Sequence, residues 1–165
     1  MSRSSHRWLA YVKDRVFVLT LLWAGFVLGI SFMATPLKFQ APSLTLPVAM
    51  EIAFVTFHTL NAVEIGLALA ILAVIFATPR PDRTRRLALL SGLLLLIQTL
   101  LLYTALDART VAIINGTESS IPSFHSYYVG LEVLKLALLF YLGHRQIEEY
   151  GARILTATCG AVHSN

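Results

Sequence analysis

The stretch HSYYVGLEVLKLALLFYLG, residues 125–143, has the length and apolar character of a membrane-spanning helix, yet it carries ionisable side chains near its middle. At 100° per residue, four polar positions fall within about 80° of one another, on a single helical face. These positions are His125, Tyr128, Glu132 and Lys135. A charge at the centre of a bilayer is costly, so such side chains face the protein interior and are functional candidates by default. The stretch therefore predicts a polar site inside a bundle of membrane helices.

The composition extends this interpretation to the whole chain. The 165 residues are 56% hydrophobic and only 13% charged, with a mean hydropathy of +0.70, whereas a soluble domain has about 25% charged residues. The chain contains four long apolar blocks, and each has roughly the 20 residues that a bilayer requires. The blocks span about 16–34, 48–77, 87–106 and 125–143. We predict an all-α integral membrane protein: one domain, residues 1–165, folded as a four-helix transmembrane bundle.

The lysines and arginines predict an orientation. Of the 13, ten lie in the N-terminal tail, the 78–86 loop and the C-terminal tail. The 36–47 and 107–124 loops hold one each, and the last is Lys135. Loops rich in lysine and arginine stay on the cytoplasmic side. Both termini are therefore predicted to be cytoplasmic, and the two poorly charged loops face outward.

The second block carries a polar face that matches that of the fourth. Glu51, His58 and Asn61 are separated by the same steps, seven and three residues, as the first, third and fourth members of the opening face. Blocks two and four run in the same direction, so counting 1.5 Å per residue from their cytoplasmic ends compares depths. A mid-membrane level is predicted to contain Glu64, Gln98, Glu132 and Lys135. An outer level is predicted to contain His58, Asn61, Tyr103, Asp107, Arg109, His125 and Tyr128, with Glu51 above it.

These two levels favour an interior that opens outward and binds or conducts a small ligand, an ion or a proton. Carboxylates and histidines within a membrane are typical of proton and ion pathways. The candidate ligand-binding residues are Glu64, Gln98, Glu132, Lys135, Asn61, Tyr128, Asp107, Arg109 and Glu51. Besides the lipid bilayer, the expected partners are that ligand and further copies or a larger membrane complex, not nucleic acid. A structural alternative is that the polar faces only hold an accessory subunit in such an assembly.

The second interpretation is a membrane redox protein. His58 and His125 fall at matched depth on parallel blocks, as two axial ligands of haem b or ligands of another metal would. Three glutamates near the same levels exceed what haem ligation requires. A ferritin-like metal site needs Glu-x-x-His from two helices, and that pattern is absent. Haem b therefore stands as the alternative cofactor.

A third interpretation, a membrane enzyme, has less support. The segment Asn61-Ala62-Val63-Glu64 resembles the N-x-x-E core of the glutathione-using four-helix membrane eicosanoid enzymes. Those enzymes have arginines one and two turns earlier, where this chain has Phe57 and Phe54. A glutathione carboxylate would have no partner there, so no catalytic residue is assigned.

Three segments carry a resemblance to a family. Thr35-Pro36-Leu37-Lys38-Phe39, Leu106-Asp107-Ala108-Arg109 and the opening polar face resemble a group of uncharacterised bacterial inner-membrane proteins with four spans. More distantly, Trp23-Ala24-Gly25 is similar to the first-helix motif of copper-resistance-D-like membrane proteins, whose wider group includes haem-dependent members. The resemblance implies a bacterial inner-membrane location but brings no established activity.

Two further features of the first block were assigned to packing. Gly25 and Gly29 form a G-x-x-x-G pattern, in which small residues let another helix approach closely. We expect this approach within the bundle, with a dimer face as the alternative. Trp23 is expected in packing or in an interfacial aromatic belt.

Overall fold

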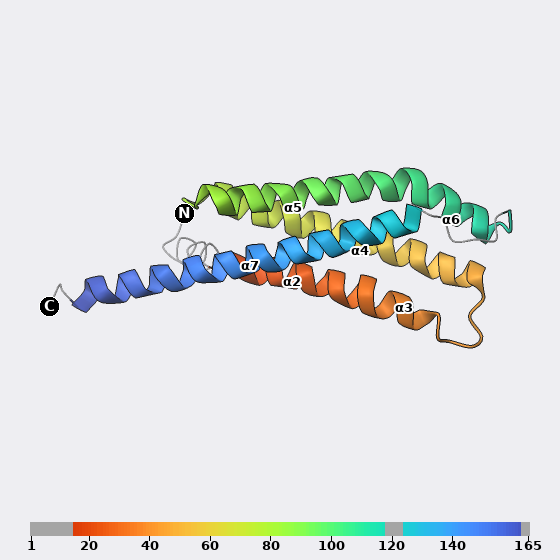
Figure 1. Cartoon of the computed structure of the whole chain (residues 1–165), viewed down its shortest axis with the longest axis horizontal. Coiled ribbons are helices and arrows are strands. Elements are labelled where there is room, and N and C mark those ends of the chain that lie inside the picture. The colour runs from red at the N-terminus through yellow and green to blue at the C-terminus, as the bar shows by residue number, and fades with distance from the viewer. Residues whose placement is uncertain (1–14, 118–123, 163–165) are drawn as a thin grey trace, which may run out of the picture.

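The computed structural model describes residues 15–117 and 124–162, with the side chains of the last helix described for 126–156. No strand occurs in these residues, and the chain forms four long helical rods (Figure 1). The first rod comprises α2 (Val16–Val27), a π-helical segment η1 (Leu28–Ala34) and α3 (Thr35–Lys38). The second is α4 (Leu46–Phe76). The third comprises α5 (Asp82–Leu101), a second π-helical segment η2 (Leu102–Leu106) and α6 (Asp107–Ile114), and the fourth is α7 (Phe124–Val162).

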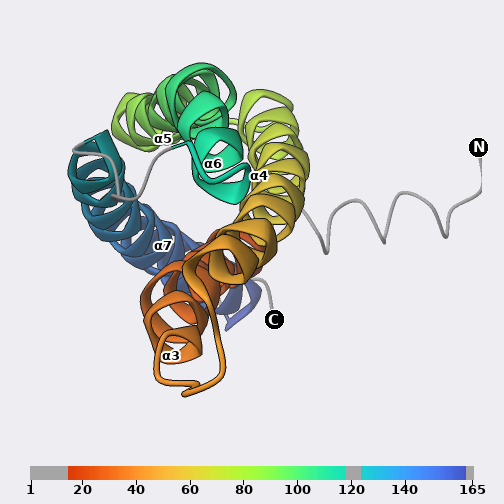
Figure 2. The same ribbon diagram turned by 90° about the vertical axis from the view of Figure 1, so that its right-hand side faces the viewer.

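All four rods are long and apolar enough to cross a membrane, which confirms the predicted number of candidate spans. They run up and down in turn, and each packs against two neighbours, in the cyclic order α2, α4, α5, α7. α4 and α7 therefore face each other across the bundle (Figure 2). We call the end at which α4 passes into α5 the turn end, and the opposite end the α6 end.

Buried side chains recur along each helix at alternating steps of four and three residues, the spacing of helices that pack at shallow angles in a bundle. On α5 they are Thr84, Ala88, Ser91, Leu95 and Gln98, and the series continues to Leu102 at the start of η2. On α7 they are Tyr128, Glu132, Lys135, Leu139, Leu142 and Gln146. Polar residues thus occupy much of the interior. The outer surface is apolar instead, with Val55, Leu69 and Leu134 between 57% and 65% exposed.

The two π-helical segments explain why two rods continue past their predicted ends. Pro36 has no N–H and its ring crowds the preceding turn, so a proline normally ends or kinks a helix. Here the widened turns of η1 precede it, and the rod continues to Lys38 rather than ending at Ala34. Likewise η2 carries the third rod to Ile114, so the predicted 107–124 loop is wrong for its first eight residues.

The helix boundaries also differ at the turn end. Two prolines, Pro79 and Pro81, disfavour helix in the residues before them and separate α4 from α5. α5 begins at Asp82, within the predicted 78–86 loop. α7 continues beyond Gly143 to Val162, so the predicted C-terminal tail is largely helical. A hydropathy criterion detects only the apolar part of such a helix.

Gly25 and Gly29 do not pack within the bundle as expected. A Cβ atom added at either glycine would have no neighbour within 4 Å in the part of the chain that the structure describes. The close helix approach lies elsewhere, at Gly143, where an added Cβ would lie 3.0 Å from the Leu21 side chain of α2. The dimer face stays a prediction.

Candidate functional site

An ion cluster lies in the middle of the bundle and joins three helices. Lys135 Nζ of α7 lies 2.6 Å from Glu64 Oε1 of α4 and 3.1 Å from Glu132 Oε2 of its own helix. Trp23 of α2 donates its indole N–H to Glu64 Oε1 at 2.7 Å. The Lys135 contacts are ion pairs, although neither has the angle of a well-directed hydrogen bond. We call Glu64, Glu132 and Lys135 the ion cluster.

The helical register explains this meeting. Glu132 and Lys135 are three residues apart, so their side chains share a face of α7. That face points across the bundle centre toward α4, and the long lysine side chain reaches Glu64 on the opposite helix. Counting the rise per residue along the helices predicts that Glu64, Glu132 and Lys135 lie at the same depth in the membrane. The structure brings these three side chains into contact.

The side chains of the ion cluster are buried, and their formal charges do not balance. Lys135 is fully buried, and Glu64 and Glu132 are each 1% exposed. Two carboxylates and one ammonium sum to a formal charge of −1. A buried charge without compensation is so costly that the group takes up a proton or a counter-ion instead. The arrangement therefore favours one additional positive charge, held as a proton or as a cation.

Neighbouring polar groups have spare hydrogen-bonding capacity. Asn61, one turn before Glu64, donates to Thr99 Oγ1 at 2.8 Å, while its Oδ1 is buried without a hydrogen-bond partner in the described residues. Gln98, adjacent to Thr99, is also buried, and neither its Oε1 nor its Nε2 has a partner among those residues. Buried polar groups usually have partners, so this unused capacity is unusual.

Polar and aromatic side chains continue from the ion cluster toward the α6 end. Tyr128, one turn before Glu132, is buried, and its ring packs edge-on against Phe57 with ring centres 6.0 Å apart. Further toward that end, His58 Nε2 lies 3.0 Å from Asp107 Oδ2, joining α4 to α6. Titratable groups therefore occur in succession from the bundle centre to its α6 end.

The hydrogen bonds of His58 require a proton between it and Asp107. Its Nδ1 lies 2.8 Å from the backbone carbonyl of Phe54, an acceptor, so Nδ1 must donate. Nε2 faces a carboxylate oxygen, and a neutral histidine protonated at Nδ1 has no hydrogen at Nε2. Either His58 is an imidazolium paired with a carboxylate, or Asp107 is a carboxylic acid. The pair is neutral overall in both cases.

Toward the turn end, apolar side chains close the interior. Leu139 and Leu142 follow Lys135 on α7 and are fully buried against the other helices. The cluster around them includes Ala68, Ile71, Ile75, Ala88 and Leu95. This apolar layer separates the ion cluster from the polar groups at the turn end.

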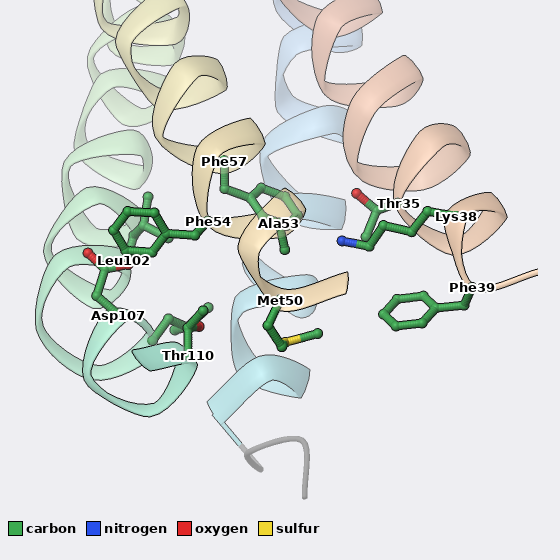
Figure 3. A pocket seen from close by; sticks show the side chains of 11 residues that line it. Thr35, Lys38, Phe39, Met50, Ala53, Phe54, Phe57, Leu102, Asp107 and Thr110 are labelled. Atoms are coloured by element: carbon green, nitrogen blue, oxygen red, sulfur yellow. The ribbon is translucent and has the colours of Figure 1, made fainter. Parts of the chain in front are cut away.

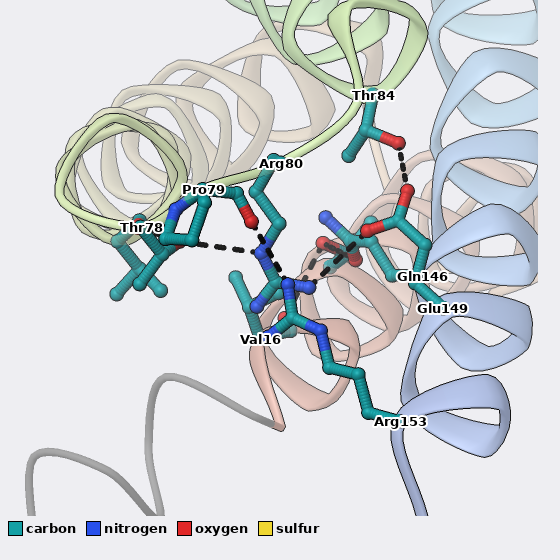
Figure 4. Close-up of polar contacts among 10 residues, drawn as sticks. Val16, Thr78, Pro79, Arg80, Thr84, Gln146, Glu149 and Arg153 are labelled. Atoms are coloured by element: carbon teal, nitrogen blue, oxygen red, sulfur yellow. Dashed lines mark hydrogen bonds and ion pairs between the residues drawn. The ribbon is translucent and has the colours of Figure 1, made fainter. Parts of the chain in front are cut away.

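Beyond the apolar layer, a second polar network fastens α7 to the turn between α4 and α5 (Figure 4). Arg80 Nη1 pairs with Glu149 Oε2 at 3.2 Å, and Thr84 donates its hydroxyl to the same carboxylate. Arg153 donates to the carbonyl of Pro79 at 2.9 Å. One turn earlier on α7, Gln146 accepts a hydrogen bond of 2.8 Å from Thr20 of α2. We call the Arg80–Glu149–Thr84 contacts the turn clasp.

The remaining predicted site residues are placed differently. Glu51 is exposed on the surface of α4. Arg109 is half-buried on α6. Tyr103 lies against His58, with ring centres 4.7 Å apart. The side chain of His125 lies outside the described residues. A haem held by His58 and His125 therefore stays a prediction, and His58 would have to give up its Asp107 contact to bind iron.

Sequence reasoning missed Trp23 and the turn clasp. Trp23 was assigned to packing or an interfacial belt, whereas its side chain is 1% exposed and its N–H binds Glu64. No sequence signal fixes this role, because the buried face of α2, on which Trp23 lies three residues after Thr20, is set by the rotation of that helix in the bundle. Arg80 had been counted only as a loop charge, and the predicted fourth span ended before Glu149 was reached.

No group of three or more metal-ligating side chains (His, Cys, Asp or Glu) is found in the part of the chain described by the structure. Comparison with known protein families, curated proteins and solved structures yields no match to this chain. The resemblance to four-span inner-membrane proteins therefore stays a prediction from the sequence.

Proposed function

We propose that the chain is a multi-pass protein of the bacterial inner membrane that binds a proton at the ion cluster. Membrane insertion is supported by the distribution of side chains. Apolar residues such as Leu69 and Leu134 are exposed, whereas Glu64 and Lys135 are buried. Four rods meet the length and hydropathy of membrane spans. In lipid, exposed apolar side chains carry no cost, while ionic groups must find partners inside the bundle.

The orientation is supported by arginines at the turn end. Arg80, Arg83, Arg85 and Arg86 lie in or next to the turn, and Arg145 and Arg153 lie on the part of α7 that runs beside and past it (Figure 1). By the positive-inside rule this end faces the cytoplasm. The α6 end then faces outward, and both termini are cytoplasmic.

A proton fits the ion cluster better than a metal cation does. The observation that carries the proposal is the pairing of two buried carboxylates with a single amine. Lys135 Nζ already occupies the position between Glu64 and Glu132 that a cation would take. A proton needs no further room, and two neighbouring carboxylates readily share one.

The surroundings favour binding from one side over conduction through the bundle. Tyr128 and the His58–Asp107 pair lie between the ion cluster and the outward end. On the cytoplasmic side, Leu139 and Leu142 are fully buried in the apolar layer, and the buried hydroxyl of Ser91 at this level donates to the Leu87 carbonyl of its own helix. The proton therefore exchanges with the outside, and the protein senses or responds to outside acidity.

Glu132→Gln should remove the bound proton. The remaining Glu64 and Lys135 have no net charge, so no extra proton is required. In infrared spectra of the purified protein at neutral pH, the wild type should show a carbonyl stretch of a protonated carboxylic acid that shifts in D₂O. The band should persist in Asp107→Asn, which removes any contribution from that acid, and it should be lost when Glu132→Gln or Glu64→Gln is added to Asp107→Asn.

Glu51→Gln is the matched control, because Glu51 is an exposed carboxylate on the same helix as Glu64. Its spectrum should keep the band. Asp107→Asn protein without such a band, or a band that survives when Asp107→Asn is combined with Glu132→Gln and with Glu64→Gln, would contradict proton binding at the ion cluster.

Reporter fusions test the orientation. Green fluorescent protein fused after Asn165 should fluoresce, and alkaline phosphatase fused at the same point should be inactive, because it matures only outside the cytoplasm. Phosphatase fused within the 39–45 connection should be active. The reverse pattern would invert the assignment of the two ends and with it the side from which the proton arrives.

A further inference from the structure

A cavity lies in the bundle at the α6 end, between α3, α4 and the η2–α6 segment (Figure 3). Its volume of about 90 Å³ is several times that needed for one water molecule. Met50, Phe54 and Phe57 line it from α4, and Leu102 and Leu106 from η2. Most of the cavity wall is therefore apolar. The few polar residues in the wall determine which chemical class of ligand the cavity can bind.

Lys38 is the main charged residue in the otherwise apolar cavity wall, and its ammonium points toward α4 in Figure 3. One of its three donors binds the carbonyl of Ala49 at 3.1 Å. No carboxylate pairs with Lys38 in the described residues, whereas Lys135 has two. Asp107, the acid in the cavity wall, approaches from the other side of α4 and is neutralised by His58. The cavity therefore carries an unneutralised positive charge.

Two irregular segments frame this cavity. Thr35 and Lys38 lie immediately after η1, and Leu102 and Leu106 are the first and last residues of η2. Thr35 donates its hydroxyl to the carbonyl of Ile30, within the widened turns. Such π-helical turns in otherwise regular helices frequently occur at functional sites. Here they bring Lys38 and the apolar wall of η2 to the same space.

We propose that this cavity binds an amphipathic monocarboxylic acid, with its carboxylate on Lys38 and its hydrocarbon body against Met50, Phe54 and Phe57. The amine supplies two unused donors and the charge opposite to a carboxylate. The flexible methionine side chain and the phenylalanine rings can pack against the hydrocarbon chain of such a ligand in more than one conformation. The volume of about 90 Å³ is too small for the two chains of a phospholipid. The site does not depend on the proton-binding proposal, because none of the ion-cluster residues lines the cavity.

Octanoate is a suitable probe, with octan-1-ol as its uncharged analogue. Calorimetry on the purified full chain in non-ionic detergent should show saturable octanoate binding. Lys38→Met should weaken it about tenfold or more, the effect of losing one charge-assisted contact. Octanol should bind wild type and Lys38→Met alike. Arg86→Met is the matched control, since it removes an exposed positive charge at the other end and should bind octanoate as wild type does.

A second variant keeps the test decisive if Lys38→Met folds poorly. Ala53→Leu fills the cavity from its α4 wall, leaves Lys38 in place and should abolish binding of both probes. The proposal is overturned if octanoate does not saturate, if its affinity is unchanged in Lys38→Met, or if Ala53→Leu still binds it. Displacement of octanoate by phosphatidylglycerol at concentrations as low as those at which octanoate itself saturates the site would assign the cavity to phospholipid and also overturn the proposal.

Discussion

Lys135→Met is expected to cause the largest loss of stability of any single substitution in the ion cluster. It leaves Glu64 and Glu132 fully buried, without the ammonium that lies 2.6 and 3.1 Å from them. Removing one partner of a buried ion pair costs about 3–5 kcal/mol, because the other charge stays behind unpaired. Thermal unfolding in detergent, followed by circular dichroism, should show a clearly lower midpoint for the variant.

The cost should come from charge and not from lost packing, since methionine nearly matches the lysine stem. Adding Glu132→Gln to Lys135→Met leaves one carboxyl group, which can hold a proton and still accept the Trp23 N–H. The double variant should therefore be more stable than Lys135→Met alone. Arg86→Met, which removes an exposed charge, should melt close to wild type. A Lys135→Met protein that melts like wild type, or a double variant that melts lower, would refute this account.

The ion cluster could be predicted from sequence because charge in an apolar block has few ways to be satisfied. Glu132 and Lys135 share a helical face, and Glu64 falls at the same level when the register is counted. Trp23 could not be assigned on that basis. An indole N–H is equally suited to an interfacial belt, and only the rotation of α2 about its axis directs it toward Glu64.

The lengths of the helices were harder to predict, because hydropathy measures composition and not periodicity. After Gly143 the sequence becomes polar, so the fourth span was ended there. The alternating steps of four and three nevertheless continue, from Leu139 and Leu142 to Gln146 and on to Glu149. In the third rod, the continuation through η2 depends on a local widening of the helix that hydropathy and helical periodicity do not reveal.

This continuation of α7 leads to the second large effect, expected for Glu149→Ala. The substitution removes the carboxylate that pairs with Arg80 and accepts from Thr84. The Arg80 side chain is only 1% exposed, so its charge would remain buried without that partner. A loss of about 3 kcal/mol is expected on the same grounds as for Lys135. Hydrogen exchange should also become faster in the turn between α4 and α5.

Glu148→Ala is a close control, because it removes the adjacent carboxylate, which binds Arg145 on the exposed side of α7. An exposed pair contributes roughly 0–1 kcal/mol, so this variant should melt almost like wild type. Arg80→Met combined with Glu149→Ala should lose less stability than the two single losses added together, since neither charge is left alone. Equal effects of Glu148→Ala and Glu149→Ala, or strict additivity, would mean that the turn clasp does not hold α7 to the turn. The stability of this end would then depend on the apolar layer around Leu139 and Leu142 and on the remaining contacts of Gln146 and Arg153.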